Sequence, residues 1–155
     1  MAWLKKEQIV EMGFACFGNN VMLSDKTSYY NCKNIRLGDN VRIDDFSVLS
    51  AGSGGIHIGN HVHIAFNVSI IGAGSITISD FAGISARCAI YSSNDDYSGL
   101  VLTGPTVPAA FTNVNHADVR IGRHVVIGAG SIVLPGVTIE EGVASRGATH
   151  RGPAR

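Results

Sequence analysis

The side chains best suited to proton transfer in this chain are its histidines and one pair of adjacent aspartates. The histidines are His57, His61, His63, His116, His124 and His150. A histidine titrates near neutral pH and can accept a proton from a reacting group, and a carboxylate beside it can orient the ring and stabilise its charged form. We expect the general base to be His63 or His116, with Asp95 and Asp96 as the orienting carboxylates.

The position of His63 suggests how such a pair would form. His63 precedes Ile64, which we expect to point inward, so the histidine itself should point outward. On the outer face of an oligomer it would be able to meet Asp95 and Asp96 of another chain. Each histidine would equally serve as a surface or interface residue that only hydrogen-bonds, and the two aspartates as a solvated turn.

These side chains are set into a repeat in which an aliphatic residue returns at every sixth position. The repeat occupies residues 35–90 and 119–143, in four series: Leu37, Ile43 and Leu49; Ile58, Ile64 and Ile70; Ile78, Ile84 and Ile90; Ile121, Ile127, Val133 and Ile139. A helical period of 3.6 cannot hold this spacing on one face, whereas short strands that each end in a sharp corner can. Six residues a side and three sides a coil predict a triangular β-solenoid of about five coils with an aliphatic interior.

The composition is that of one ordinary globular domain. The chain has 155 residues, of which 45% are hydrophobic and 15% charged, and its twelve basic and twelve acidic residues cancel. A nucleic-acid-binding protein would show a basic excess. Three cysteines without metal-type spacing predict buried thiols in a reducing compartment. No apolar stretch reaches the roughly 20 residues that span a bilayer, and the N-terminus does not resemble a signal peptide, so we expect a cytoplasmic protein.

The chain divides into three parts. Residues 1–34 are predicted to form a helix over 2–12 and a cap over the open end of the prism, followed by an irregular segment. Residues 35–144 form the prism, and residues 145–155 form a basic tail. Small-residue interruptions at 51–55 and 72–75 predict stacked bulged corners, either a flexible wall beside a substrate or simply permissive turns. Residues 92–118 leave the repeat as a long loop, and loops of that length are usually functional or disordered.

Three segments carry a resemblance to a known family. IGNHVHIA (58–65), IGRHVVIGAG (121–130) and LPGVTI (134–139) resemble the hexapeptide-repeat acyltransferases. YSSNDDYSG (91–99) is similar to a branch of polysaccharide and lipopolysaccharide O-acetyltransferases. The resemblance covers roughly residues 35–144 and extends to galactoside-acetyltransferase-like proteins. The resemblance implies an all-β, left-handed parallel β-helix, a homotrimer, and a long loop that reaches a neighbouring subunit.

The resemblance also implies the reaction. Acetyl-CoA would donate an acetyl group to a hydroxyl or amino group of a sugar or nucleotide sugar, for a surface polysaccharide. The pantetheine arm would lie on backbone N–H groups at the corner formed by Gly128, Ala129, Gly130 and Ser131, with Arg146 near the phosphates. The acceptor would meet the loop residues Asn94, Tyr97 and Asn115. We expect no metal ion.

Two other functions stay open. The tail departs from the family pattern, in which another aliphatic coil follows residue 143, so an inactive relative or an assembly scaffold is one alternative. The other is a metal protein like the hexapeptide-repeat carbonic anhydrases. It is less favoured because His57, His61 and His63 lie too close in sequence to reproduce a zinc site whose ligands come from two subunits.

Overall fold

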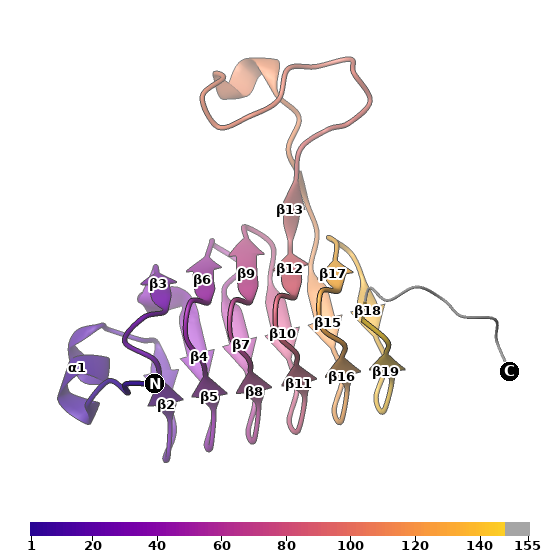
Figure 1. Ribbon diagram of the computed structural model, residues 1–155. Coiled ribbons are helices and arrows are strands. Elements are labelled where there is room, and N and C mark those ends of the chain that lie inside the picture. Colours follow the sequence, from indigo (N-terminus) through magenta and orange to yellow (C-terminus); the bar gives the residue numbers. More distant parts are fainter. Residues whose placement is uncertain (148–155) are drawn as a thin grey trace, which may run out of the picture.

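The aliphatic residue of each hexad points into the centre of a three-sided parallel β-helix, as the six-residue spacing predicts. In the computed structural model, which describes residues 1–147, every member of the four series except Ile139 is at most 6% exposed. Removing a Leu, Ile or Val side chain from water contributes roughly 1.5–3 kcal/mol. The row of aliphatic residues is therefore the main source of stability, and the predicted all-β solenoid is confirmed (Figure 1).

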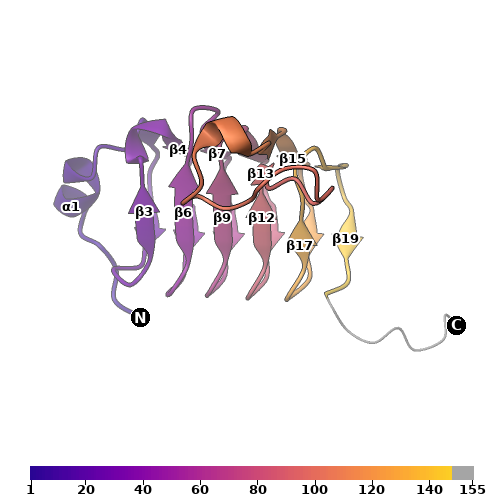
Figure 2. The same cartoon turned by 90° about the horizontal axis from the view of Figure 1, so that it is seen from above.

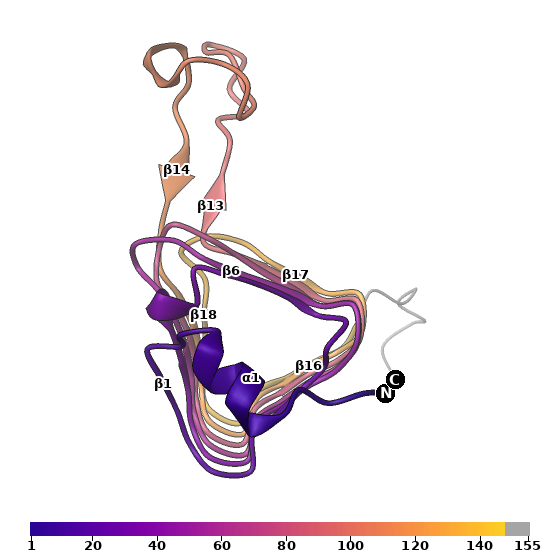
Figure 3. The same cartoon turned by 90° about the vertical axis from the view of Figure 1, so that its left-hand side faces the viewer.

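Three parallel sheets form the sides of the prism (Figure 3). Face 1 consists of β1 (Cys16–Phe17), β4 (Ile35–Leu37), β7 (Ile56–Ile58), β10 (Ile76–Ile78), β15 (Val119–Ile121) and β18 (Thr138–Ile139). Face 2 consists of β2 (Met22–Leu23), β5 (Arg42–Ile43), β8 (His63–Ile64), β11 (Gly83–Ile84), β16 (Val126–Ile127) and β19 (Ala144–Ser145). Face 3 consists of β3 (Ser28–Tyr30), β6 (Val48–Ala51), β9 (Ser69–Gly72), β12 (Ala89–Tyr91) and β17 (Ile132–Val133).

The solenoid begins one coil earlier than the sequence indicated. Strands β1, β2 and β3 pair with the next coil, so that Phe17 lies beside Leu37, Leu23 beside Ile43 and Tyr29 beside Leu49. The boundary predicted at residue 35 is therefore corrected, and the two larger sheets have six strands rather than about five. The six-residue spacing is present at Phe17, Leu23 and Tyr29. The aromatic residues Phe17 and Tyr29 stand where the other coils have aliphatic ones, so the repeat was not recognised there.

The N-terminal helix α1 (Lys6–Glu11) covers the open end of the prism, as predicted (Figure 3). Its Ile9 is 3% exposed and belongs to the core. The helix is shorter than the predicted 2–12 because Trp3 bridges to Ser24 and the amide of Leu4 donates to the carbonyl of Leu23. Within residues 1–147 no helix is long and apolar enough to cross a membrane.

The corner between faces 1 and 2 holds non-glycine residues in the left-handed backbone region. Asn40, His61, Phe81 and His124 occupy it on successive coils, with φ between 55° and 61°. Asparagine tolerates this conformation, whereas aromatic residues do so at a cost. Here the rings stack in a column, because Phe81 lies 5.0 Å from His61 on one side and 5.0 Å from His124 on the other. The rings of His61 and His124 are therefore both packed against Phe81 in this corner.

The long loop rises from the opposite corner, between faces 3 and 1 (Figures 1 and 3). Its stem is an antiparallel pair, β13 (Ser93–Asn94) and β14 (Asn115–His116), and its outer part carries the 3-10 turn η2 (Ala109–Phe111). Seen from above, the outer part lies over face 3 and the adjoining corner (Figure 2). A second 3-10 turn, η1 (Cys32–Asn34), precedes β4.

The small-residue corner beneath the stem is closely packed. A Cβ on Gly72 would lie 2.1 Å from Ser92 Oγ, and one on Gly74 would lie 2.8 Å from the carbonyl oxygen of Ala117. Ser92 is completely buried and donates its hydroxyl to the carbonyl of Gly74 at 2.7 Å. The glycines are therefore needed for close approach of the chain, which favours tight turns over a flexible wall.

Replacing Gly72 by Ala should disturb the base of the stem, because the added methyl group must displace Ser92. We expect the free energy of unfolding to fall by about 1–3 kcal/mol, with amide chemical-shift changes concentrated in residues 92–118. Gly83→Ala is the matched control, because a Cβ at Gly83 meets nothing within 4 Å. Urea denaturation and NMR would check both variants. Equal stability and equal spectra for the two would contradict this packing.

Candidate active site

His116 is fixed on the stem by a serine that the sequence analysis did not select. Ser93 lies opposite His116, and Ser93 Oγ is 2.7 Å from His116 Nδ1. The same oxygen accepts the backbone N–H of Ala73 at 2.8 Å. On the neighbouring pair, Asn115 donates to Asn94 Oδ1 at 3.4 Å. The stem thus brings together the predicted residues His116, Asn94 and Asn115, and it ties His116 to the prism.

The two predicted aspartates are not equivalent. Asp96 accepts the backbone N–H of Ser98 at 2.7 Å and the side-chain N–H of Asn113 at 2.8 Å. Hydrogen bonds from Ser98 and Asn113 hold the pKa of Asp96 below its ordinary value. Asp95 makes no hydrogen bond or ion pair with any other residue of 1–147.

Side chains alternate along the stem, which separates these groups into two sets. Asn94 and Asp96 contact Asn115 and Asn113, so they lie on one side. Ser93 contacts His116, and Asp95, two residues along, is expected on that same side. On this expectation, the side of the stem with Ser93, Asp95 and His116 carries an exposed imidazole and a free carboxylate. We call it the reactive side. Tyr97 lies further out and is 83% exposed.

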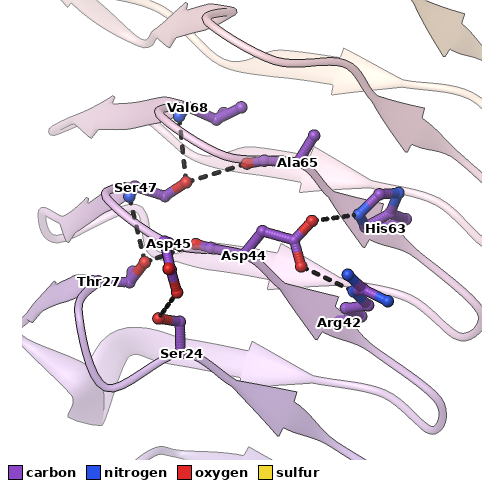
Figure 4. Close-up of polar contacts among 9 residues, drawn as sticks. All are labelled: Ser24, Thr27, Arg42, Asp44, Asp45, Ser47, His63, Ala65 and Val68. Atoms are coloured by element: carbon purple, nitrogen blue, oxygen red, sulfur yellow. Dashed lines mark hydrogen bonds and ion pairs between the residues drawn. The ribbon is translucent and has the colours of Figure 1, made fainter. Parts of the chain in front are cut away.

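His63 occupies a different place, on face 2, where it has a carboxylate partner in its own chain. His63 Nε2 lies 2.8 Å from Asp44 Oδ2, and Asp44 Oδ1 accepts Arg42 Nε at 2.7 Å (Figure 4). Only 9% of the Asp44 side chain is exposed. Burial by itself raises the pKa of Asp44, but the hydrogen bonds and charges of Arg42 and His63 outweigh it and hold this pKa below its ordinary value.

The backbone around Asp44 is held by buried hydroxyl groups. Thr27 Oγ1 donates to the carbonyl of Asp44 at 2.7 Å and accepts the N–H of Ser47 at 3.1 Å, and Ser24 bonds to Asp45 (Figure 4). The sequence analysis did not select Asp44 as the partner of His63. A coil of about 21 residues places Arg42 directly beside His63, and Asp44 follows two residues later.

The structure separates His63 from the stem of its own chain, because face 2 is opposite the corner that carries the stem (Figure 3). A meeting of His63 with Asp95 or Asp96 therefore requires a second chain and stays a prediction.

The three histidines at positions 57, 61 and 63 lie apart in the structure. His57 lies on face 1, in β7, His63 lies on face 2, and His61 lies at the corner between them. Among residues 1–147 no three His, Cys, Asp or Glu side chains come close enough to hold a metal ion. His150 lies outside the described residues.

Three of the five residues predicted to bind coenzyme A border a cavity of about 520 Å³ at the C-terminal end of the prism. Its lining includes Gly130, Ser131 and Arg146, together with Ile132 and Val137. The predicted use of backbone N–H groups is corrected for Gly128, Gly130 and Ser131. Gly128 donates to Ser145, Gly130 to Ala86 and Ser131 to Gly128, so these three amides are engaged within the chain. Sequence alone does not reveal such a commitment.

Replacing Asp44 by Asn should destabilise the fold at neutral pH. It removes a buried charge that is bonded by the Arg42 guanidinium and the His63 ring, at a cost of about 1–3 kcal/mol. Because folding lowers the pKa of Asp44, its stabilising contribution is present above the unfolded pKa, about 3.9, and is lost as the pH falls through the folded value.

Urea titrations at several pH values would check this expectation, with the exposed Asp25→Asn as the control for charge. The difference between wild type and Asp44→Asn should be large at pH 7 and should shrink below about pH 4. A difference that did not change with pH would contradict an ionised Asp44 as its source.

Individual relatives show which family this chain belongs to, although no family model matches it. The dTDP-4-amino-4,6-dideoxy-D-glucose acyltransferase of Escherichia coli is 56% identical over 144 residues, which cover 93% of this chain and 75% of that protein. Nodulation protein L of Rhizobium meliloti (strain 1021) is 39% identical over 89 residues, which cover 54% of this chain and 42% of that protein.

Solved structures similar to this one are also those of an acyltransferase. AntD, an N-acyltransferase from Bacillus cereus, superimposes with a TM-score of 0.88 and 42% identity over 94% of this chain and 76% of AntD, in a complex with dTDP-4-amino-4,6-dideoxyglucose and coenzyme A. A complex of AntD with dTDP and 3-hydroxybutyryl-CoA gives 0.86 and 44% over 92% of this chain and 74% of AntD. This chain therefore belongs to the hexapeptide-repeat sugar acyltransferases and is an acyl-CoA-dependent enzyme of that family.

Proposed function

We propose that the enzyme transfers an acetyl group from acetyl-CoA to the 4-amino group of dTDP-4-amino-4,6-dideoxy-D-glucose, for use in a surface polysaccharide. The observation that carries this proposal is the 56% identity to the Escherichia coli acyltransferase for that nucleotide sugar, which extends over 93% of the chain. The complex of AntD with the same nucleotide sugar and coenzyme A supports it. An amine is thereby preferred over the sugar hydroxyl that the sequence left as an alternative.

The reaction requires one proton to leave the acceptor. The amine nitrogen attacks the thioester carbon, a C–N bond forms, and the C–S bond breaks to release CoA. The nitrogen then loses a proton, and the departing sulfur gains one. Asp95 is suited to accept the proton, because its carboxylate has no partner among residues 1–147 and is expected on the reactive side of the stem. Asp96 is not, because Ser98 and Asn113 already occupy its oxygens.

The acyl donor is proposed to bind at the cavity bordered by Gly130, Ser131 and Arg146. Its lining by Ile132 and Val137 suits the apolar pantetheine arm, and the Arg146 guanidinium suits a phosphate. The corner from Gly128 to Ser131 would then act through its small size rather than through the engaged amides of Gly128, Gly130 and Ser131. Acceptor contacts from Asn94, Asn115 and Tyr97 also belong to this proposal.

A homotrimer is proposed as the working form. The outer surface exposes Phe46, Phe66 and Phe81, and the loop exposes Leu100 at 88%, which is a large apolar area for one small chain. Light scattering should return about three times the 16.3 kDa of the chain. A monomer mass at micromolar concentration would count against the trimer.

We also propose a cytoplasmic location, which the three free thiols support.

The proposed reaction is tested by following thiol release with a panel of donors and acceptors. dTDP-4-amino-4,6-dideoxy-D-glucose should be the best acceptor, and dTDP-glucose, which has no amine, should not react. Acetyl-CoA and 3-hydroxybutyryl-CoA would be compared as donors. A protein that neither bound CoA nor released thiol would support the scaffold alternative.

Replacing Asp95 by Asn should lower turnover by about 100-fold or more, because the carboxylate that accepts the proton is lost. Asp96→Asn removes the same charge from the next residue, and its amide oxygen can still accept the Ser98 N–H, so most of the turnover should remain. Binding of CoA, measured by calorimetry, should be equal in both variants. Equal turnover losses would exclude the special role of Asp95.

A further inference from the structure

The contact between Ser93 and His116 bears on which ring nitrogen of the histidine carries a hydrogen. A serine hydroxyl has one hydrogen to donate and two lone pairs that accept. Ser93 Oγ accepts the N–H of Ala73 at 2.8 Å, and a backbone N–H can only donate. The only other partner of this oxygen within residues 1–147 is His116 Nδ1, at 2.7 Å. If the hydroxyl hydrogen is directed at Nδ1, it has a partner within residues 1–147, whereas an Nδ1–H that donated to Oγ would leave the hydroxyl hydrogen without one.

The contact with Ala73 is held firmly. Ala73 belongs to the closely packed corner, where its carbonyl accepts the N–H of Gly54 at 2.9 Å. The next residue of the chain, Ser92, is buried and bonded to Gly74. The serine hydroxyl is thus oriented by the prism and not by the loop.

We propose that Ser93 holds neutral His116 in the tautomer with hydrogen on Nε2, so that His116 acts as a hydrogen-bond donor to the reacting thioester oxygen and not as the proton acceptor. A neutral imidazole has one N–H and one lone pair. When Nδ1 accepts from Ser93, the hydrogen must be on Nε2, which points away from this contact. An Nε2 that already carries hydrogen cannot remove another from an amine.

This role complements that of Asp95 and rests on the proposed function. As the amine attacks, negative charge develops on the thioester oxygen and positive charge on the nitrogen. An N–H donor stabilises the first and a carboxylate the second, and the reactive side of the stem carries one of each. His116 is then a catalytic residue, and Ser93 is a positioning residue that acts through it.

The tautomer can be measured directly on the free enzyme. Nitrogen-15 NMR of histidine-labelled protein at about pH 8, where an ordinary imidazole is neutral, distinguishes protonated from unprotonated ring nitrogens. The His116 signals are assigned by their absence from His116→Gln. We expect unprotonated Nδ1 and protonated Nε2 in wild type and in Ser93→Thr, which keeps the hydroxyl, and a mixture of tautomers in Ser93→Ala. A wild-type ring with hydrogen on Nδ1 would overturn the proposal.

The donor role is tested by two substitutions of the same histidine. Glutamine can place an amide N–H near the position of Nε2 but cannot take up a proton, whereas alanine does neither. His116→Ala should lose about 100-fold in turnover, and His116→Gln should keep a substantial part of it. Equal losses would contradict the donor role of His116. If no acceptor in the panel reacted at all, the proposed function would fail, while the NMR measurement would still decide the tautomer.

Discussion

Every coil of this protein must place its inward aliphatic side chains directly on those of the coil before it. The requirement comes from the narrow interior, in which Ile43, Ile64, Ile84 and Ile127 form one continuous buried row. A shift of one residue would turn these side chains outward and polar ones inward. The coil length is thereby restricted to about 20 or 21 residues, as the bonds from Asn19 to Asp39 and from Asp39 to Asn60 illustrate. Only outward side chains and corners remain free for chemistry.

The long loop shows how the fold satisfies this restriction and still presents reactive groups. It leaves at a corner, so that β12 and β15 keep their places in the faces. Its two ends are bonded to the preceding coil, because Ser93 accepts from Ala73 and Asp118 accepts the N–H of Ser75 at 2.8 Å. A segment that lies outside the repeat is therefore positioned by it. The His63–Asp44 pair on face 2 is held by the same stacking, with its two members on successive coils.

Much of the fold followed from the sequence, because six-residue spacing has a single physical explanation when it persists over many repeats. The first coil was missed where Phe17 and Tyr29 replace aliphatic residues. Among the site residues, His116, Asn94 and Asn115 were expected in the loop and do lie together on the stem. The difference between Asp95 and Asp96 could not be predicted, because it depends on Asn113 reaching one of them across the stem. The engaged amides of Gly128 and Gly130 likewise depend on neighbouring coils that sequence spacing does not specify.

The most direct measurement of the central claim is the structure of the product. After incubation with acetyl-CoA and dTDP-4-amino-4,6-dideoxy-D-glucose, the purified nucleotide sugar would be examined by proton and carbon NMR. The account predicts one new amide whose N–H couples to the proton on C4 of the sugar, with the hydroxyl groups unchanged. An ester on a sugar hydroxyl, or unmodified nucleotide sugar after prolonged incubation with an enzyme shown to bind CoA, would contradict it.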